Sequence, residues 1–248
     1  MASTELTGPR NPDPAKIKLF RLSIQARFVY TLFIQLMKKR IYYFHGFKSA
    51  GGGSKYEILR KVYGQEYQIH SPTLGNNVYE VRRELRQIGN ALEASDDYSL
   101  VIGTSMGGFY ARYFAAVIHY CPIILVNPVL KPSDHMAKYL GTQRNFKSGD
   151  AFEFTREDLQ LLKQMEDEIR DSLYSGHFHH LVALGKQDEL VDVQAVADMF
   201  EHRPTVKFYN DDHRFNDKFE EMLREERTRN FIDSPWVDHS DFQIDPVG

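Results

Sequence analysis

The segment Gly103-Thr104-Ser105-Met106-Gly107 decides how the rest of the chain is interpreted. It matches the pattern G-x-S-x-G and stands between an apolar run with strand character, 99–102, and a longer apolar stretch with helical character, 106–119. A strand-to-helix turn of this kind must be sharp enough to lift the serine hydroxyl clear of the sheet. Side chains at the two flanking positions would collide with neighbouring backbone, which explains glycine at 103 and 107.

On both sides of this turn, short β-rich runs alternate with helical stretches, a pattern that predicts βαβ units and a parallel sheet. The expected strands are 41–44, 67–70, 99–102, 123–126, 181–184 and 206–209. The expected helices are 54–64 with Ser54 as its cap, 77–94 with Asn77 as its cap, 106–119, 193–200 and 217–231. Six mostly parallel strands flanked by helices make an open, doubly wound α/β sheet.

The alternation stops between Pro128 and His180, a stretch of about 50 residues that is too long for a simple connection. Thr155 begins a helical pattern there, whereas Gly141 to Asp150 is polar and is expected to be a loop. We interpret residues 129–178 as a lid inserted over the carboxyl edge of the sheet. The resulting organisation is a basic extension at 1–40, a domain at 41–233 and a tail without periodicity at 234–248.

Charge is distributed unevenly along the chain. The 248 residues have a net charge of −3, but residues 1–40 hold eight basic and two acidic residues, which leaves 41–248 at −9. Nucleic-acid binding needs clustered Lys and Arg to neutralise phosphates, so the acidic body argues against that class. Cys121 is the single cysteine. It excludes an intramolecular disulfide framework, is expected in the core, and fits a reducing, cytoplasmic compartment.

The basic extension leaves three interpretations open. Residues 16–37 could form an amphipathic helix that contacts a membrane surface, with basic residues opposite Phe20, Ile24 and Phe28. The segment could be an organelle-targeting presequence. Translation could also begin naturally at Met37, because Met-Lys-Lys-Arg running into the first strand resembles an ordinary start. We favour this last interpretation. No bilayer span is expected, because the longest apolar run falls short of the about 20 residues that a span requires.

A serine at such a turn acts as a nucleophile when a base and an orienting acid lie next to it. In a sheet of this kind these groups follow later strands in the order serine, acid, histidine. Asp188 follows the fifth expected strand and His213 follows the sixth. Because parallel strands place their carboxyl ends on one edge, we expect both side chains to meet Ser105 there. Glu189 and Asp192 remain as alternatives for the acid.

Negative charge that develops during attack on a carbonyl needs two backbone N–H groups directed at it. Met106, the first residue of the helix after Ser105, is the candidate for one of them, and the helix dipole adds to its effect. The second is expected from the loop after the first strand, where Gly46 permits a sharp turn and Phe47 N–H is our candidate. His45 is expected to brace this loop by hydrogen bonds rather than to act as the base.

Two weaker signals have ordinary structural explanations. His177, His179 and His180 form an H-x-H-H cluster, but histidines at the entrance of a strand alternate between its faces, so we expect no metal site. Aromatic residues of the lid either line an acyl pocket or pack the lid itself, and both interpretations stay open. These aromatic residues are Tyr139, Phe146, Phe152 and Phe154.

Six short segments also carry a resemblance to a known family. They are His45-Gly46-Phe47, Ser54-Lys55, Gly103 to Tyr110, Val126-Asn127-Pro128, Gln187 to Asp192 and Asp212 to Phe215. From residue 41 to 232 the chain resembles the YqiA/YcfP-like (UPF0227) small esterases of the α/β-hydrolase superfamily. Three glycines at 51–53 and the pair Asp211-Asp212 depart from the family pattern.

The resemblance implies the α/β-hydrolase fold and a serine esterase or thioesterase with Ser105 as nucleophile, Asp188 as acid and His213 as base. The expected enzyme is a carboxylic-ester hydrolase that needs no metal or organic cofactor and takes a small-molecule ester or thioester. The alternative from a different class is a catalytically silent hydrolase fold that binds a partner. The sequence leaves open the acyl preference, the choice between ester and thioester, and the oligomeric state.

Overall fold

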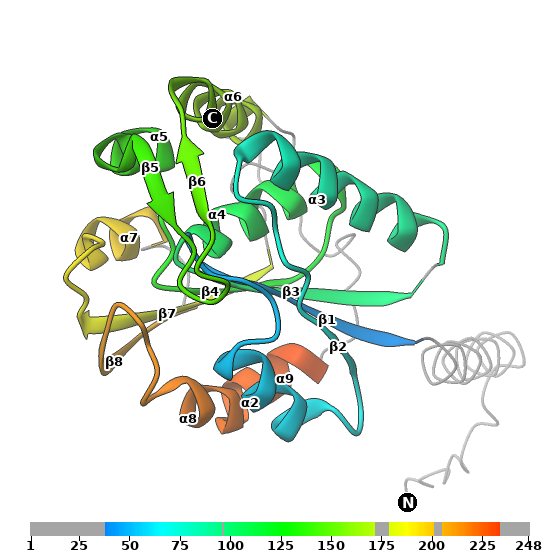
Figure 1. The fold of residues 1–248 in the computed structure, drawn as a ribbon. Coiled ribbons are helices and arrows are strands. Elements are labelled where there is room, and N and C mark those ends of the chain that lie inside the picture. The colour runs from blue at the N-terminus through cyan, green and yellow to red at the C-terminus, as the bar shows by residue number, and fades with distance from the viewer. Residues whose placement is uncertain (1–37, 96, 172–178, 201–204, 234–248) are drawn as a thin grey trace, which may run out of the picture. The chain divides into compact units, whose positions relative to one another are not determined.

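The computed structural model of the chain describes residues 38–95, 97–171, 179–200 and 205–233. Its main sheet has six strands in the order β2-β1-β3-β4-β7-β8, and every neighbouring pair is parallel (Figure 1). The strands are β1 (Lys39–Phe44), β2 (Gln68–His70), β3 (Tyr98–Thr104), β4 (Ile123–Val126), β7 (His180–Gln187) and β8 (Val206–Asp212). All six expected strands and the α/β class are confirmed.

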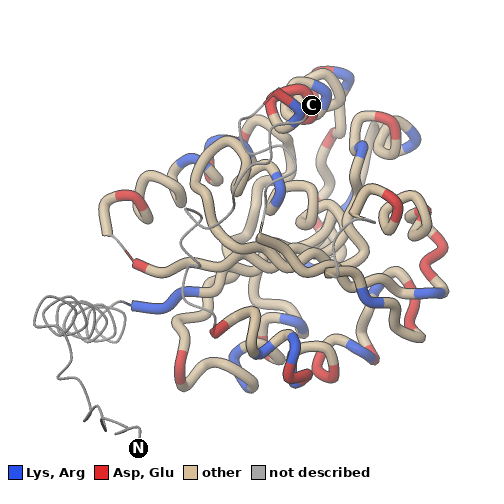
Figure 2. Tube along the Cα trace, turned by 180° about the vertical axis from the view of Figure 1, so that it is seen from behind, with Lys and Arg blue, Asp and Glu red and all other residues tan. Residues whose placement is uncertain are grey.

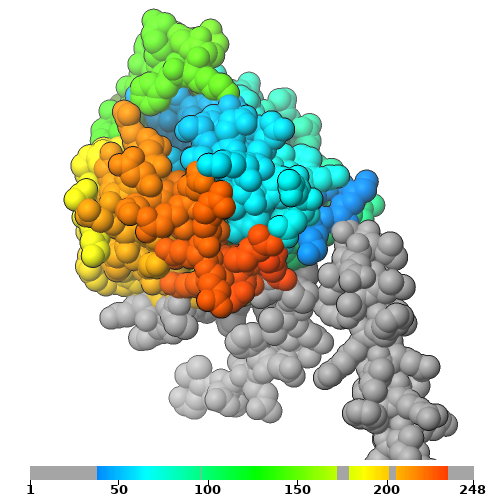
Figure 3. Space-filling model, turned by 90° about the horizontal axis from the view of Figure 1, so that it is seen from below, coloured from blue at the N-terminus to red at the C-terminus, as the bar shows by residue number. Residues whose placement is uncertain are grey.

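Helices cover both faces of this sheet, as βαβ crossovers require. One face carries α3 (Val78–Glu93), α4 (Met106–Tyr113) and α7 (Val193–Met199). The other face carries α2 (Ser54–Tyr63), α8 (Phe219–Arg224) and α9 (Glu226–Asp233) (Figure 1). Seen from below, α2 in cyan lies beside α8 and α9 in orange and red (Figure 3).

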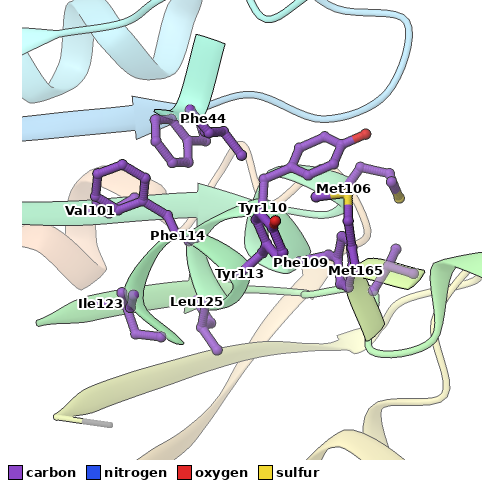
Figure 4. Close-up of a cluster of buried hydrophobic side chains, with 14 of the residues drawn as sticks. Phe44, Val101, Met106, Phe109, Tyr110, Tyr113, Phe114, Ile123, Leu125 and Met165 are labelled. Atoms are coloured by element: carbon purple, nitrogen blue, oxygen red, sulfur yellow. The ribbon is translucent and has the colours of Figure 1, made fainter. Parts of the chain in front are cut away.

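Alternation of side chains along each strand produces two separate cores. On β3, Val101 belongs to the core beneath α3 and α4, whereas Leu100 and Ile102 belong to the core over α2 and α8. On β4, Ile123 and Leu125 join the first of these cores. Strands buried on both faces must be apolar at consecutive positions, which explains their continuous apolar runs. Figure 4 shows the first core, where these strands meet Phe109, Tyr113 and Phe114.

Of the two helix caps predicted from the sequence, the structure contains one, Asn77, and not the other, Ser54. Asn77 caps α3, because its Oδ1 accepts a hydrogen bond of 2.8 Å from the N–H of Glu80. The expectation of Ser54 as the cap of α2 was wrong. Ser54 is the first helical residue, and the cap is Gly53, whose backbone is extended and which has no side chain to form a capping bond.

Two of the expected helices are interrupted. The helix expected at 106–119 is α-helical only to Tyr113 and continues as a single π-helical segment, Phe114–Ile118. The helix expected at 217–231 is divided into α8 and α9 by Glu225, whose ψ of 138° is extended. The carboxylate of Glu225 binds Lys207 Nζ at 2.7 Å and Tyr209 OH at 2.9 Å, so the break follows from contacts with β8.

The segment between β4 and β7, which includes the lid expected at 129–178, contains more regular structure than the sequence predicted. It comprises α5 (Pro132–His135), a 3-10 turn (Met136–Tyr139), β5 (Gly141–Arg144), β6 (Ala151–Phe154) and α6 (Arg156–Asp171). The prediction of a loop at 141–150 was therefore wrong for residues 141–144, which form β5. β5 pairs antiparallel with β6 in a separate two-stranded sheet, and its exposed residues are polar because no core covers them.

Charged residues belong mainly to the helices, the loops and the strand ends, whereas the sequences of β3 and β4 at the centre of the sheet contain none (Figure 2). Within the described ranges, no helix is both long and apolar enough to cross a membrane. Our expectations for residues 1–37 and for the tail at 234–248 lie outside the described residues.

Candidate active site

Ser105 lies at the turn between β3 and α4 with a strained backbone. Its φ of 54° and ψ of −121° define a backbone conformation that residues other than glycine rarely adopt. The turn is tight enough to require glycine on both sides. A Cβ at Gly103 would lie 2.2 Å from the carbonyl oxygen of Gly107, and a Cβ at Gly107 would lie 2.0 Å from that of Phe44.

Hydrogen bonds hold this strained residue from both sides. The N–H of Ser105 donates to the carbonyl oxygen of Val126 at 3.0 Å, which ties the turn to the end of β4. The carbonyl oxygen of Ser105 accepts from the N–H of Gly108 at 2.9 Å and from that of Val129 at 3.1 Å. The backbone of Ser105 is thus fixed on both sides of the turn.

The structure brings Ser105, His213 and Asp188 together at the carboxyl edge of the sheet. His213 Nε2 lies 2.9 Å from Ser105 Oγ. His213 Nδ1 lies 2.8 Å and 2.9 Å from the two carboxylate oxygens of Asp188. The Asp188 side chain is 0% exposed and that of His213 is 11% exposed. With Nδ1–H donating to Asp188, the lone pair of Nε2 is free to accept the serine proton.

Three carboxylates follow β7, and they have different roles. Asp188 Oδ1 also accepts the N–H groups of the residues two and three positions later, both at 2.8 Å, which fixes its orientation. Glu189 accepts the backbone N–H of His213 at 3.3 Å. Asp192 caps α7 by accepting from Gln194 and Ala195. Of the three, Asp188 is the one whose carboxylate contacts the imidazole ring.

Asn127 is a buried residue to which the sequence analysis gave no role. Its Oδ1 accepts the N–H of Gly185 at 2.7 Å, and its Nδ2 donates to the carbonyl oxygens of Asp212 and His213 at 2.9 Å and 3.1 Å. One side chain at the end of β4 thereby connects the ends of β7 and β8. An asparagine directly after an apolar strand was the available signal in the sequence.

The loop after β8, which carries His213, is shaped by charged side chains. Asp212 Oδ1 accepts the N–H of Arg214 at 2.8 Å. Lys55 Nζ donates to the carbonyl oxygen of Arg214 at 2.6 Å and to Asn216 Oδ1 at 2.8 Å. Burial lowers the pKa of Lys55 to about 8, while the negative charges of Asp211 and Asp212 act in the opposite direction. Asp211 and Asp212 therefore stabilise a buried cation.

The loop after β1 passes directly beside Ser105. A Cβ at Gly46 would lie 3.4 Å from Ser105 Cβ and 3.8 Å from Ser105 Oγ. His45 Nε2 accepts the N–H of Leu74 at 3.1 Å, so the ring proton is on Nδ1, which donates to the carbonyl oxygen of Gly46 at 2.9 Å. Burial lowers the pKa of His45 below 6.5, so the ring is neutral at pH 7. His45 thus braces this loop, as its sequence context predicted.

A cavity of about 710 Å³ opens above Ser105 and His213. Phe47 and Met106, the two candidate amide donors, both line it. His135 of α5 also lines the cavity, and no motif in the sequence pointed to it. Burial lowers the pKa of His135, and the positive charge of Lys138 lowers it further.

The lid aromatics support both interpretations that the sequence left open. Tyr139 and Phe146 line the cavity, and Tyr139 also packs against Phe47, with ring centroids 5.6 Å apart. Phe152 and Phe154 pack against Phe47, with ring centroids 5.7 Å and 5.4 Å away.

Two of the three histidines of the H-x-H-H cluster, His179 and His180, lie within the described residues. Within the described ranges, no group of three or more His, Cys, Asp or Glu side chains is placed to hold a metal ion. The ring of His179 lies 4.4 Å from that of Phe231, and the ring of His180 lies 4.8 Å from that of Phe200. His177 lies outside the described residues.

Comparison with known proteins places the chain in a family. The model of an uncharacterised protein family, UPF0227, matches residues 40–227. The chain belongs to the UPF0227 family. It is 26% identical over 161 residues to a UPF0227 protein of Pectobacterium atrosepticum, a match that covers 63% of this chain and 79% of that protein. The resemblance stated from the sequence motifs is thereby confirmed.

Solved structures similar to this UPF0227 protein show its fold. Est1E from Butyrivibrio proteoclasticus matches with a TM-score of 0.59 and 14% identity, over 79% of this chain and 86% of that chain. A monoacylglycerol lipase from Paleococcus ferrophilus matches with a TM-score of 0.56 and 10% identity, over 79% of this chain and 96% of that chain. At these identities the likeness concerns the fold alone, and it confirms the α/β-hydrolase fold.

Proposed function

We propose that this UPF0227 protein is a serine hydrolase that cleaves carboxylic esters or acyl thioesters. The observation that carries the proposal is the contact of 2.9 Å between Ser105 Oγ and His213 Nε2, with Asp188 hydrogen bonded to the other ring nitrogen. A serine hydroxyl is a weak nucleophile until an adjacent base takes its proton. The strained turn, the buried acid and the cavity above the serine all support this chemistry.

In the proposed acylation step, Ser105 Oγ forms a bond to the carbonyl carbon while its proton moves to His213 Nε2. The carbonyl electron pair moves onto the oxygen, where the N–H groups of Met106 and Phe47 stabilise it. Asp188 holds the imidazole tautomer and stabilises the imidazolium that forms. When the tetrahedral intermediate collapses, the bond to the alcohol or thiol breaks, and the leaving group takes the proton from His213.

Deacylation repeats these transfers with water. His213 takes a proton from a water molecule as its oxygen attacks the acyl carbon, and Ser105 Oγ leaves with the proton returned by the imidazolium. The products are a carboxylic acid and the free enzyme. The reaction as proposed uses only the side chains and backbone amides of this chain, together with water. The shared fold with a protein named a monoacylglycerol lipase supports ester chemistry at this edge of the sheet.

Labelling with a fluorophosphonate tests the proposal, because this reagent phosphonylates an activated serine and reacts poorly with an ordinary serine hydroxyl. The wild-type protein should be labelled once, and Ser105→Ala should not be labelled. Ser49 and Ser54 line the same cavity, so Ser49→Ala and Ser54→Ala are matched controls that should keep the label. A folded wild-type protein that stays unlabelled would contradict the proposal and favour a silent binding fold. Rates on nitrophenyl esters and acyl thioesters of increasing chain length would then define the substrate class.

A further inference from the structure

Asn145 lies in the turn between β5 and β6, and its side chain is buried although the hairpin is at the surface. Its Oδ1 accepts the N–H groups of Lys147 at 2.9 Å and Ser148 at 3.1 Å, which closes the turn. Its Nδ2 donates to the carbonyl oxygen of Ser49 at 2.9 Å and, more weakly, to Asn76 Oδ1 at 3.4 Å. The oxygen of this amide therefore builds the hairpin turn, and the nitrogen connects that turn to the loop after β1.

The next two residues of the turn bind the same loop, which we call the oxyanion loop (residues 45–51). The N–H of Phe146 donates to the carbonyl oxygen of Lys48 at 2.7 Å. The ammonium group of Lys147 donates to the carbonyl oxygen of Gly51. Three consecutive hairpin residues thus donate to three backbone carbonyls of the oxyanion loop. Figure 3 shows the green hairpin segment standing against the blue and cyan segment that follows β1.

The oxyanion loop needs external support because one of its residues is strained. Lys48 has a φ of 59°, in the left-handed region that disfavours residues with a Cβ. The hairpin binds the carbonyl oxygen of Lys48 through Phe146 N–H. It binds the next carbonyl oxygen, that of Ser49, through Asn145 Nδ2. The Lys48 ammonium also lies 4.7 Å from the centroid of the Phe146 ring. The hairpin therefore stabilises the conformation that strain opposes.

Phe47, the residue before Lys48, is held by the lid through its ring. Its centroid lies 5.6 Å from Tyr139, 5.7 Å from Phe152 and 5.4 Å from Phe154. Rings at such separations attract each other beyond simple burial. On its other side Phe47 follows Gly46, which lies beside Ser105. A continuous path of contacts thus leads from the hairpin to the nucleophile.

We infer that Asn145 is a positioning residue that sets the direction of the Phe47 N–H by fixing the oxyanion loop to the β5–β6 hairpin. This inference rests on the proposed function, because it concerns the same acyl transfer at Ser105. The hairpin then has a part in catalysis, although none of its hydrogen bonds to the oxyanion loop touches the reacting atoms. Donors to an oxyanion act through prior alignment, so a displaced amide weakens transition-state binding more than substrate binding.

The test is the variant Asn145→Asp, which is isosteric. Its Oδ1 still accepts the two N–H groups that close the turn, but the Nδ2 donor is replaced by an oxygen that faces the carbonyl of Ser49. We expect kcat on a nitrophenyl ester to fall at least about tenfold, less than the about 10²–10³-fold loss of one oxyanion donor, with KM changed less than about twofold. The inhibition constant of a trifluoromethyl ketone, which mimics the tetrahedral intermediate, should rise by a similar factor.

Thr142→Val is the matched control for this test. Thr142 is an exposed residue of the same hairpin, and its hydroxyl bonds Glu153 across the two strands rather than the oxyanion loop. This variant should keep the kcat and KM of the wild-type protein. Active-site titration with fluorophosphonate gives the fraction of competent enzyme in each variant, so that a loss of folded protein is separated from a loss of kcat.

A second pair of variants tests the role of strain. Lys48→Gly and Lys48→Ala both remove the ammonium group, but only glycine accepts a positive φ without strain. In the Asn145→Asp background, Lys48→Gly should recover part of the lost kcat and Lys48→Ala should not.

A wild-type kcat in titrated Asn145→Asp, or equal effects of glycine and alanine at position 48, would overturn the inference. Failure of the wild-type protein to react with any ester or fluorophosphonate would overturn the proposed function instead. Should Asn145→Asp not fold, Asn145→Ser is the second variant: it adds no charge, its oxygen can still accept within the turn, and its shorter side chain does not extend to the carbonyl oxygen of Ser49 as Nδ2 does. The same outcomes apply to it.

Discussion

Lys55 of α2 donates a hydrogen bond of 2.6 Å to the carbonyl oxygen of Arg214, the residue that follows His213. A second bond of 2.8 Å, to Asn216 Oδ1, holds the same loop two residues later. A buried ammonium group therefore fixes the backbone that carries the proposed base. Because burial lowers the pKa of Lys55 only to about 8, the group is mostly charged at pH 7, and both hydrogen bonds are strengthened by its charge.

Replacement of this ammonium group should impair turnover. In Lys55→Met, two loop acceptors lose their donor, and we expect kcat to fall by about tenfold, because positions of catalytic groups must hold to about 0.5 Å. Lys61→Met is the matched control, since Lys61 lies on the same helix but is exposed and pairs with Glu220. Steady-state kinetics with melting curves for both variants would check this, and equal kcat values in the two would contradict it.

The acid of the proposed triad can be tested by comparing two carboxylates that follow β7. Asp188→Asn should keep the fold and lower kcat on the order of 10³–10⁴-fold, because the amide favours the wrong imidazole tautomer. Asp192→Asn should be nearly unchanged, since asparagine caps a helix as well as aspartate does. Ester hydrolysis by the two purified variants gives the comparison. Substantial activity in Asp188→Asn would assign the acid to another carboxylate.

The tight turn at Ser105 predicts a large difference between two glycine substitutions. In Gly107→Ala the new Cβ would lie 2.0 Å from the carbonyl oxygen of Phe44, so backbone must move. We expect a loss of more than about 3 kcal/mol in the free energy of unfolding, in the range of severe overpacking. Gly53→Ala meets nothing within 4 Å and has a negative φ, so its effect should stay within about 0.5 kcal/mol. Urea unfolding of both variants would measure the difference.

Stability should decrease on mild acidification because His45 is buried in its neutral form. Its folded-state pKa lies below the ordinary value of 6.5. When the pH falls through 6.5, His45 of the unfolded chain therefore binds a proton, whereas buried His45 of the folded chain stays neutral. The free energy of unfolding then falls as pH falls in this window. His45→Gln should lower the unfolding midpoint at pH 7 but show a shallower decline between pH 7 and 5. Parallel slopes for both proteins would contradict this contribution.

The sequence predicted the strands well for a physical reason. Strands such as β3 and β4 are buried on both faces, so they are apolar without interruption and end at polar turns. The proposed nucleophile and acid directly follow β3 and β7, and the proposed base directly follows β8, a partly exposed strand at the edge of the sheet. Their meeting therefore follows from the parallel order of the sheet rather than from any contact that a sequence would need to encode.

The features that the sequence did not predict depend on contacts between distant segments. β5 is polar, and only its pairing with β6 makes it a strand. The break at Glu225 follows from bonds to Lys207 and Tyr209. Asn127 and His135 reach the site from elements whose mutual placement a linear pattern does not contain. Polar residues that contact distant segments produce no periodic pattern in the sequence.

The position of β8 in the sheet has a consequence for how the proposed activity would be lost. β8 stands at one end of the strand order and, among the described strands, pairs with β7 alone, yet it carries the backbone that places His213. Edge elements open with less free energy than a whole domain unfolds. Detachment of β8 would withdraw the imidazole from Ser105 while the remaining strands stay paired. Ester hydrolysis should therefore be lost at a lower urea concentration than the helical circular dichroism signal.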